Sequence, residues 1–166
     1  MNQGPAVLLR RATPEDAPRV AEIWHSGWRD GHLGGVPEAL VVARTPESFF
    51  KRAVARFQSA TVAEVDGVVA GFIMVEADEV EQVYVAAEHR GTGIAQLLLT
   101  EAERQVAENG FEEAWLAAVD SNARARAFYS RAGWVDRGTF EYQAPTERGP
   151  ISVPSHRYTK NVGQRS

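Results

Sequence analysis

The stretch that decides the fold is Val83-Tyr84-Val85-Ala86-Ala87-Glu88-His89-Arg90-Gly91-Thr92-Gly93-Ile94-Ala95. A β-branched run ends at two alanines, passes a short basic segment with two glycines, and enters the helical sequence 96–102. This order predicts a strand, a glycine turn and the start of a helix. The first N–H groups of a helix lack internal partners and carry partial positive charge, which suits them to bind phosphate. Gly91 and Gly93 allow the backbone to approach an anion, and Arg90 adds a fork of donors.

Two common phosphate-binding loops do not fit this stretch. A Walker-type loop requires Lys-Ser or Lys-Thr after its last glycine, where Ile94-Ala95 stand instead. The dinucleotide fingerprint requires a small residue at the third position after Gly93, and that position is Gln96. What remains is Arg90-x-x-Gly93-x-Ala95, which taken alone is as consistent with an ordinary strand-to-helix turn.

A second pattern lies downstream, in the sequence DSNARARAFYSRAGW of residues 120–134. It predicts a short helix that is capped by Asn122 and ended by Gly133. Together with Arg90-x-x-Gly93-x-Ala95, it resembles the paired signatures of the GNAT superfamily of N-acetyltransferases. The interval between the two leaves room for one helix and one strand, as in that family. The resemblance covers nearly the whole chain and is firmest from Glu79 to Trp134.

This resemblance implies a binding site for acetyl-coenzyme A (acetyl-CoA). A loop would wrap its pyrophosphate, and this loop consists of Arg90, Gly91, Thr92, Gly93, Ile94 and Ala95. Many relatives have Gly at the position of Ala95, and the signature also allows Ala there. The strand before the loop would separate from its neighbour after Ala114. Backbone groups of Val83, Tyr84 and Val85 would then be free for the pantetheine arm and the thioester oxygen, whereas without the resemblance this strand reads as fully paired.

Tyr129 is the candidate general acid. A phenol with a pKa of about 10 is protonated at neutral pH and can donate to a thiolate, and the family places a tyrosine here. Asn122 and Tyr129 are seven residues apart, so they face the same way, and Asn122 is expected to meet the cofactor arm. The alternative is a tyrosine that only packs in the core. Phe128 is assigned to the packing face together with Ala125 and Ala132.

The candidate bases are Glu79 and Glu81. They alternate with Val83 and Val85, which predicts that all four share one face of the strand. The family often keeps a glutamate on this strand that accepts the amine proton through a water. Two alternatives stay open: both carboxylates belong to a solvated strand end, or the amine loses its proton to bulk solvent.

The acceptor is expected to be a small cationic amine, in preference to a histone-like tail or a nucleic acid. Four carboxylates crowd one strand connection and predict a patch that attracts a cation; they are Glu76, Asp78, Glu79 and Glu81. Trp24, Trp28 and His32 are the candidates for the acceptor side, because aromatic faces favour cations and apolar stems. The alternative is that the carboxylates face solvent and the tryptophans are core.

Composition bounds these expectations. The chain has 166 residues, no cysteine and a net charge of −4. One N-acetyltransferase domain over residues 1–166 is expected, with signature regions at about 79–110 and 111–134 and a hairpin at about 134–160. The histidines show no metal-ligand spacing, so no metal is expected, and neither a basic face for nucleic acid nor a membrane span is indicated. A cytoplasmic location fits the lack of cysteine, and the family makes a homodimer plausible.

Hydrophobic patterning predicts an α/β fold with a mixed sheet. The resemblance refines this to a mostly antiparallel sheet of about seven strands, flanked by about four helices and containing a splayed strand pair. The first helix begins after Thr13 and is followed by a loop over 30–37, and the second places Phe49, Phe50, Ala53, Val54 and Phe57 inward. The remaining expected elements are strands at 7–9, 61–65, 68–75, 80–85 and 114–119, helices at 94–109 and 122–132, and a final hairpin with a loop over 144–154.

Three activities remain open at this level. The leading hypothesis is an acetyl-CoA-dependent N-acetyltransferase that acts on a primary amine. The same loop would support a transferase for a longer acyl group. A non-catalytic acyl-CoA-binding or regulatory domain is the third, although such a domain would be expected to lose Tyr129 or the strand carboxylates.

Overall fold

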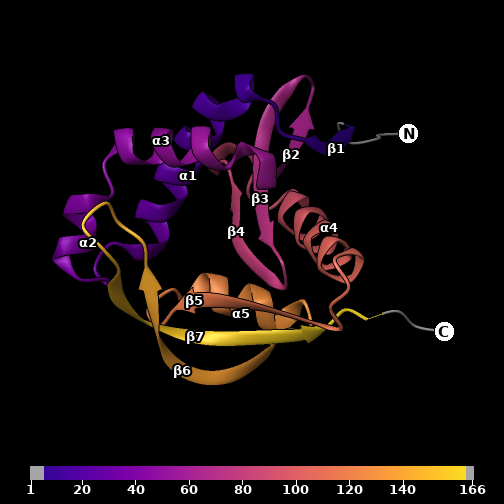
Figure 1. Ribbon diagram of the computed structural model, residues 1–166. Coiled ribbons are helices and arrows are strands. Elements are labelled where there is room, and N and C mark those ends of the chain that lie inside the picture. The colour runs from indigo at the N-terminus through magenta and orange to yellow at the C-terminus, as the bar shows by residue number, and fades with distance from the viewer. Residues whose placement is uncertain (1–5, 164–166) are drawn as a thin grey trace.

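The computed structural model describes residues 6–163 and is built around one seven-stranded sheet (Figure 1). The strand order is β1-β2-β3-β4-β5-β7-β6, and all neighbours are antiparallel except β4 and β5, which are parallel. The strands are β1 (Val7–Arg11), β2 (Ala60–Val65), β3 (Val68–Glu76), β4 (Glu79–Val85), β5 (Glu113–Val119), β6 (Val135–Ala144) and β7 (Ile151–Asn161). The expected mixed, mostly antiparallel sheet is therefore confirmed.

Helices cover both faces of this sheet (Figure 1). They are α1 (Ala17–His32), α2 (Glu38–Ala43), α3 (Pro46–Arg56), α4 (Ile94–Glu108) and α5 (Ala123–Arg131). The helices α1 and α3 pack on one face, and α4 and α5 pack on the other. Within residues 6–163 this is one α-helix more than the expected four, because α2 forms in the segment between the first two predicted helices.

Each face has its own hydrophobic core. On the α1 side, the ring of Trp24 lies edge-on to Phe49 and Phe72, with ring centres 5.6 and 5.7 Å apart. On the α4 side, Leu98 and Leu99 are fully buried against the sheet. The strand β3 runs between the two cores, and its seven central residues are all buried, as expected for a strand covered on both faces.

The helix α1 continues through the segment that was expected to be a loop, so the prediction for residues 30–32 is wrong. Glycines were taken there as turn residues, but Gly27 and Gly31 lie one turn apart on one helix face. A Cβ on Gly27 would meet Tyr84 Cδ1 at 2.4 Å, and one on Gly31 would meet Asn122 Nδ2 at 2.6 Å. These glycines therefore allow α1 to pack closely on Tyr84 and Asn122.

Two further expectations about the edges of elements are wrong. In α3, Phe49 and Ala53 of the residues expected to face inward are fully buried. Phe50 and Val54 are 44% and 49% exposed, because only one narrow face of the helix packs against the core.

The final hairpin has a shorter connection than the expected 144–154, since β7 already begins at Ile151 and pairs with β6.

The sheet is nearly interrupted between β4 and β5. These strands share a single register pair, Glu79 with Trp115. Beside this pair, the N–H of Trp115 donates a hydrogen bond to the carbonyl of Asp78 (3.0 Å). Beyond this pair β5 turns away and pairs along its length with β7, and Figure 1 shows β5 and β7 lying across the direction of β2, β3 and β4. The expected splayed strand pair is thus present.

Candidate active site

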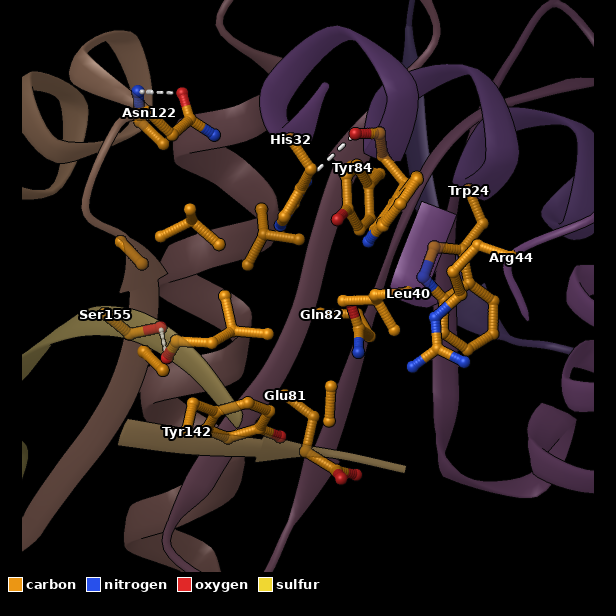
Figure 2. A pocket seen from close by; sticks show the side chains of 18 of the residues that line it. Trp24, His32, Leu40, Arg44, Glu81, Gln82, Tyr84, Asn122, Tyr142 and Ser155 are labelled. Carbon is orange, nitrogen blue, oxygen red and sulfur yellow. Dashed lines mark hydrogen bonds between the residues drawn. The ribbon is translucent and has the colours of Figure 1, made fainter. Parts of the chain in front are cut away.

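A cavity of about 160 Å³ lies where β4 and β5 separate (Figure 2). Its walls come from α1, α2 and α3 on one side and from β4, β5, α5 and the β6–β7 hairpin on the other. Figure 2 shows Trp24 and Arg44 on the helical side, with Tyr142 and Ser155 on the hairpin side. Because the cavity opens at the gap in the sheet, backbone groups as well as side chains can contact a ligand there.

A β-bulge at Glu81 decides which side chains of β4 reach this cavity. Met74 of β3 pairs with Gln82, and the next residue, Val75, pairs with Val80. Glu81 is therefore an extra residue in β4, and it shifts the alternation of the strand by one position.

This shift overturns the expectation that Glu79, Glu81, Val83 and Val85 share one face. Glu79 and Glu81 line the cavity, and Tyr84 lines it as well. The side chains of Val83 and Val85 pack against the core on the α4 side, although Val83 also contributes to the cavity lining. A strict period of two cannot reveal a bulge, which is why the sequence placed these valines on the wrong face.

The two glutamates have different environments. Burial, and then the neighbouring Glu81, raise the pKa of Glu79 to about 7, and Tyr142 Oη donates a hydrogen bond to Glu79 Oε2 (3.4 Å). Glu81 is instead held in an ion pair with Arg56 of α3. Glu79 can therefore exchange a proton near neutral pH, whereas Glu81 has a fixed cationic partner.

The predicted acidic patch does not form at this cavity. Glu76 is largely exposed, and Asp78 accepts a hydrogen bond from Trp115 Nε1 (3.2 Å); neither lines the cavity. The lining instead includes three arginines, Arg44, Arg52 and Arg56. The expectation that carboxylates dominate the charge of this site is therefore wrong.

The arginines are not among the site residues predicted above, although the sequence contains one signal for two of them. Arg52 and Arg56 follow Phe49 by three and seven positions, so they extend the inward stripe of α3. Arginines on the buried stripe of an amphipathic helix are unusual and indicate an anionic partner. Arg44 had no such signal, because α2 was not predicted.

Tyr129 lines the cavity together with Asn122, in agreement with their predicted shared face. Burial raises the pKa of Tyr129 to about 12, so its hydroxyl is protonated at neutral pH. Asn122 Oδ1 caps α5 by accepting from the N–H of Ala125 (3.2 Å). Phe128 packs in the α4-side core as expected, but Ala125 lines the cavity and does not belong to that packing face.

The aromatic candidates also line the cavity. Trp24 and Trp28 are almost fully buried, so they serve the core and the cavity wall at once. His32 is the last residue of α1 and stacks on Trp28, with ring centres 5.2 Å apart. Burial lowers the pKa of His32 to about 4, so this imidazole is neutral at pH 7.

The glycine loop forms an open cradle beside the cavity. Gly91 and Gly93 have φ angles of 77° and 87°, and no atom lies within 4 Å of a Cβ placed on either residue. Gly93 is the N-cap of α4, so the free N–H groups of Ile94 and Ala95 follow directly. Arg90 Nη2 lies 2.8 Å from Oδ2 of Asp30 on α1. An exposed helix start with room for close approach fits a diphosphate.

The free edge of β4 connects the cradle to the cavity. Ala86 N–H bonds to the carbonyl of Ala70 on β3. Because hydrogen-bonded and non-bonded residues alternate in an antiparallel ladder, the N–H and C=O groups of Val83 and Val85 point toward β5. The register of β4 with β5 ends at Glu79, so β5 provides no partner at these two residues.

Within residues 6–163, no cluster of three or more His, Cys, Asp or Glu residues could hold a metal ion. In the same range, no helix combines the length and the apolar character that crossing a membrane requires.

Comparisons with known proteins agree with this geometry. The chain is 27% identical over 134 residues to an uncharacterized N-acetyltransferase of Archaeoglobus fulgidus, covering 74% of this chain and 88% of the relative. A GCN5-related N-acetyltransferase structure from Rhodopseudomonas palustris has a TM-score of 0.71 at 20% identity and covers 97% of this chain and 98% of its own. The structure of YncA from Salmonella typhimurium with its cofactor acetyl-CoA has a TM-score of 0.68 at 18% identity, with coverages of 97% and 96%. The profile of the Acetyltransferase (GNAT) family matches residues 18–134, and the chain belongs to this family of acyltransferases.

Proposed function

We propose that this chain transfers an acetyl group directly from acetyl-CoA to the primary amine of a small acceptor, and that residues 1–166 act as one N-acetyltransferase domain. The observation that carries the proposal is the free edge of β4 at Val83 and Val85, which joins the cradle at Gly91–Ala95 to the cavity. YncA, a structural relative, holds acetyl-CoA. A cytoplasmic location and a homodimer stay predictions.

The donor is held by backbone and by one arginine. The N–H groups from Gly91 to Ala95 bind the pyrophosphate, and Arg90 binds at its edge after leaving Asp30. The pantetheine arm lies along the free edge of β4 and ends beside Tyr129 and Asn122. Acetyl-CoA supplies an acetyl thioester, whose carbonyl oxygen accepts a hydrogen bond from the backbone of β4.

Two side chains move protons in this scheme. Glu79 accepts a proton from the acceptor ammonium, directly or through a water, because its raised pKa lies near the working pH. The amine nitrogen then forms a bond to the acetyl carbon, and the carbon–sulfur bond breaks. Tyr129 donates its hydroxyl proton to the departing sulfur, since burial keeps this phenol protonated, and CoA leaves as the free thiol. The amide nitrogen loses the second amine proton, which restores the Tyr129 hydroxyl through solvent, and Glu79 releases its proton to solvent.

Calorimetry with acetyl-CoA, followed by a thiol-release assay with a panel of amines, tests the proposal. Binding together with amine-dependent release of CoA is expected. Binding without turnover on any amine would instead indicate a regulatory acyl-CoA-binding domain. Faster release from propionyl- or butyryl-CoA would indicate a transferase for a longer acyl group, and no binding at all would overturn the proposal.

A further inference from the structure

Two arginines that line the cavity, Arg44 and Arg52, have no anionic partner among the described residues 6–163. Arg44, which directly follows α2, is only 6% exposed, and its Nε makes no hydrogen bond. Arg52 lies on the inward stripe of α3, with its Cζ 4.2 Å from the centre of the Trp24 ring. Within residues 6–163 neither arginine forms an ion pair with a carboxylate, in contrast to Arg56, which pairs with Glu81 and Glu76.

The surroundings of these arginines do not compensate their charge. Burial lowers the pKa of Arg44, and burial together with the nearby Arg44 lowers the pKa of Arg52 to about 10. Both groups stay charged at pH 7. The carboxylates that share the cavity are otherwise engaged, because Glu81 is held by Arg56 and Glu79 is partly protonated near neutral pH. A buried cation without a partner is costly, so the pair is suited to an anion that arrives with a ligand.

We propose that Arg44 and Arg52 bind an oxyanion of the acceptor, so that the preferred acceptor is a small amine that also carries a carboxylate or a phosphonate group. This inference rests on the proposed function. The guanidinium fork matches the paired oxygens of either group. Figure 2 shows Arg44 beside Trp24 and Leu40, so the anionic end of the acceptor lies on the helical side of the cavity. The apolar walls at Trp24 and Trp28 then contact its body.

The donor does not account for these arginines. Its phosphates are assigned to the cradle at Arg90–Ala95, and none of those residues lines the cavity. The cradle lies at the start of α4, whereas Arg44 follows the end of α2 and Arg52 lies on α3. The charge of Arg44 and Arg52 is therefore available to the second substrate.

Matched acceptor pairs test the proposal. Each amino acid is compared with its carboxamide, and each aminoalkylphosphonate with the corresponding alkylamine, in thiol release at saturating acetyl-CoA. We expect the anionic member of at least one pair to have a kcat/KM at least tenfold higher. Arg44→Gln and Arg52→Gln should each reduce this preference at least tenfold, mainly through the KM of the anionic member.

The controls separate an anion site from a structural role. Arg131→Gln removes the same charge from an exposed position at the end of α5 and should leave the preference unchanged. Arg44→Lys keeps the positive charge but lacks the forked N–H donors of the guanidinium group. It therefore replaces Arg44→Gln in the test if that variant does not fold. The inference would be overturned if the neutral member of each pair had the same kcat/KM as the anionic member. It would also be overturned if the preference for the anionic member persisted in both Arg44→Gln and Arg52→Gln. The acetyltransferase proposal would stand in either case.

The outcomes also distinguish the two proposals from each other. If acetyl-CoA does not bind in calorimetry, the proposed function itself fails. If acetyl-CoA binds but no member of any pair is acetylated, the proposed acceptor class is wrong. The relative rates of the carboxylate and phosphonate pairs identify which oxyanion the arginines prefer.

Discussion

The hydroxyl of Tyr142 lies 3.4 Å from Oε2 of Glu79, so a side chain of β6 donates a hydrogen bond to a carboxyl of β4. This bond favours the charged carboxylate and opposes the burial that raises the pKa of Glu79 to about 7. The last hairpin therefore contributes to the proton affinity of the candidate base, although it lies far from Glu79 in the sequence.

The first prediction concerns Glu79 as the base. In the wild type, kcat/KM for the acceptor should fall on the acidic side with an apparent pKa near 7, because protonated Glu79 cannot accept the amine proton. Glu79→Gln should remove this limb and lower the plateau by roughly 10²-fold or more. Glu81→Gln is the comparison and should keep the limb, moved to lower pH because the charge of Glu81 helps to raise the pKa of Glu79. An unchanged limb in both variants would assign deprotonation to solvent.

The second prediction concerns Tyr142. Tyr142→Phe removes the hydrogen bond that lowers the pKa of Glu79. The acidic limb should therefore move to higher pH, by roughly half to one unit for a bond of this length. The measurement is the same pH profile. A limb that stays in place, or that moves to lower pH, would show that this bond does not act on the titrating group.

The third prediction concerns stability. The folded-state pKa of Glu79 is raised from 4.5 to about 7, so the folded protein binds the extra proton between these values. The stabilisation from this proton is complete below pH 4.5 and is lost as the pH rises through 7. Relative to Glu79→Gln, the wild type should lose about 1–3 kcal/mol of unfolding free energy between pH 5 and pH 8. Urea titrations at both pH values measure this difference, and parallel pH dependences in the two proteins would contradict it.

The fourth prediction concerns Tyr129 as the acid. Tyr129→Phe should lower kcat by roughly 10²–10⁴-fold with little change in acetyl-CoA affinity, because only the proton donor is lost. Tyr158→Phe is a suitable control, since that ring lies 6.0 Å from Tyr129 but does not line the cavity. Full turnover in the Tyr129 variant would remove this residue from the mechanism.

The fifth prediction concerns the cradle. Gly93→Val should abolish acetyl-CoA binding in calorimetry, because the branched side chain fills the space that an anion needs. Gly110→Val is a matched control: Gly110 also has a positive φ of 98° and open space around its Cβ position, but it lies beyond the other end of α4. Equal affinity loss in both variants would point to strain in α4, and unchanged affinity in the Gly93 variant would overturn the placement.

The sequence predicted the parts of the fold that depend on local signals. Thr13 pairs with Asp16 in a capping box before α1, Asn122 caps α5, and Ile94 begins α4, because each of these ends is set by a few neighbouring residues. The separation of β4 from β5 came from the resemblance alone, since no local pattern marks an unpaired strand edge.

What the sequence missed depends on contacts between distant segments. The bulge at Glu81 is visible only in the pairing of β4 with β3, and it moved Val83 and Val85 to the other face. Gly31 resembles a turn residue in the sequence, and only the structure shows that Asn122 packs against it. Arg44 could not be placed near the site before α2 and its packing were known.

The single register pair between β4 and β5 also affects the cohesion of the whole sheet. Within residues 6–163, strands β1–β4 are paired in sequence and so are β5, β7 and β6, and the two groups share the single register pair of Glu79 with Trp115. Under the proposed function, a pantetheine arm along the free edge of β4 acts as a detachable strand that completes the first ladder. Under the proposed function the donor is a structural element while it is bound, and the amides of Val83 and Val85 are unprotected only between the release of CoA and the binding of the next acetyl-CoA.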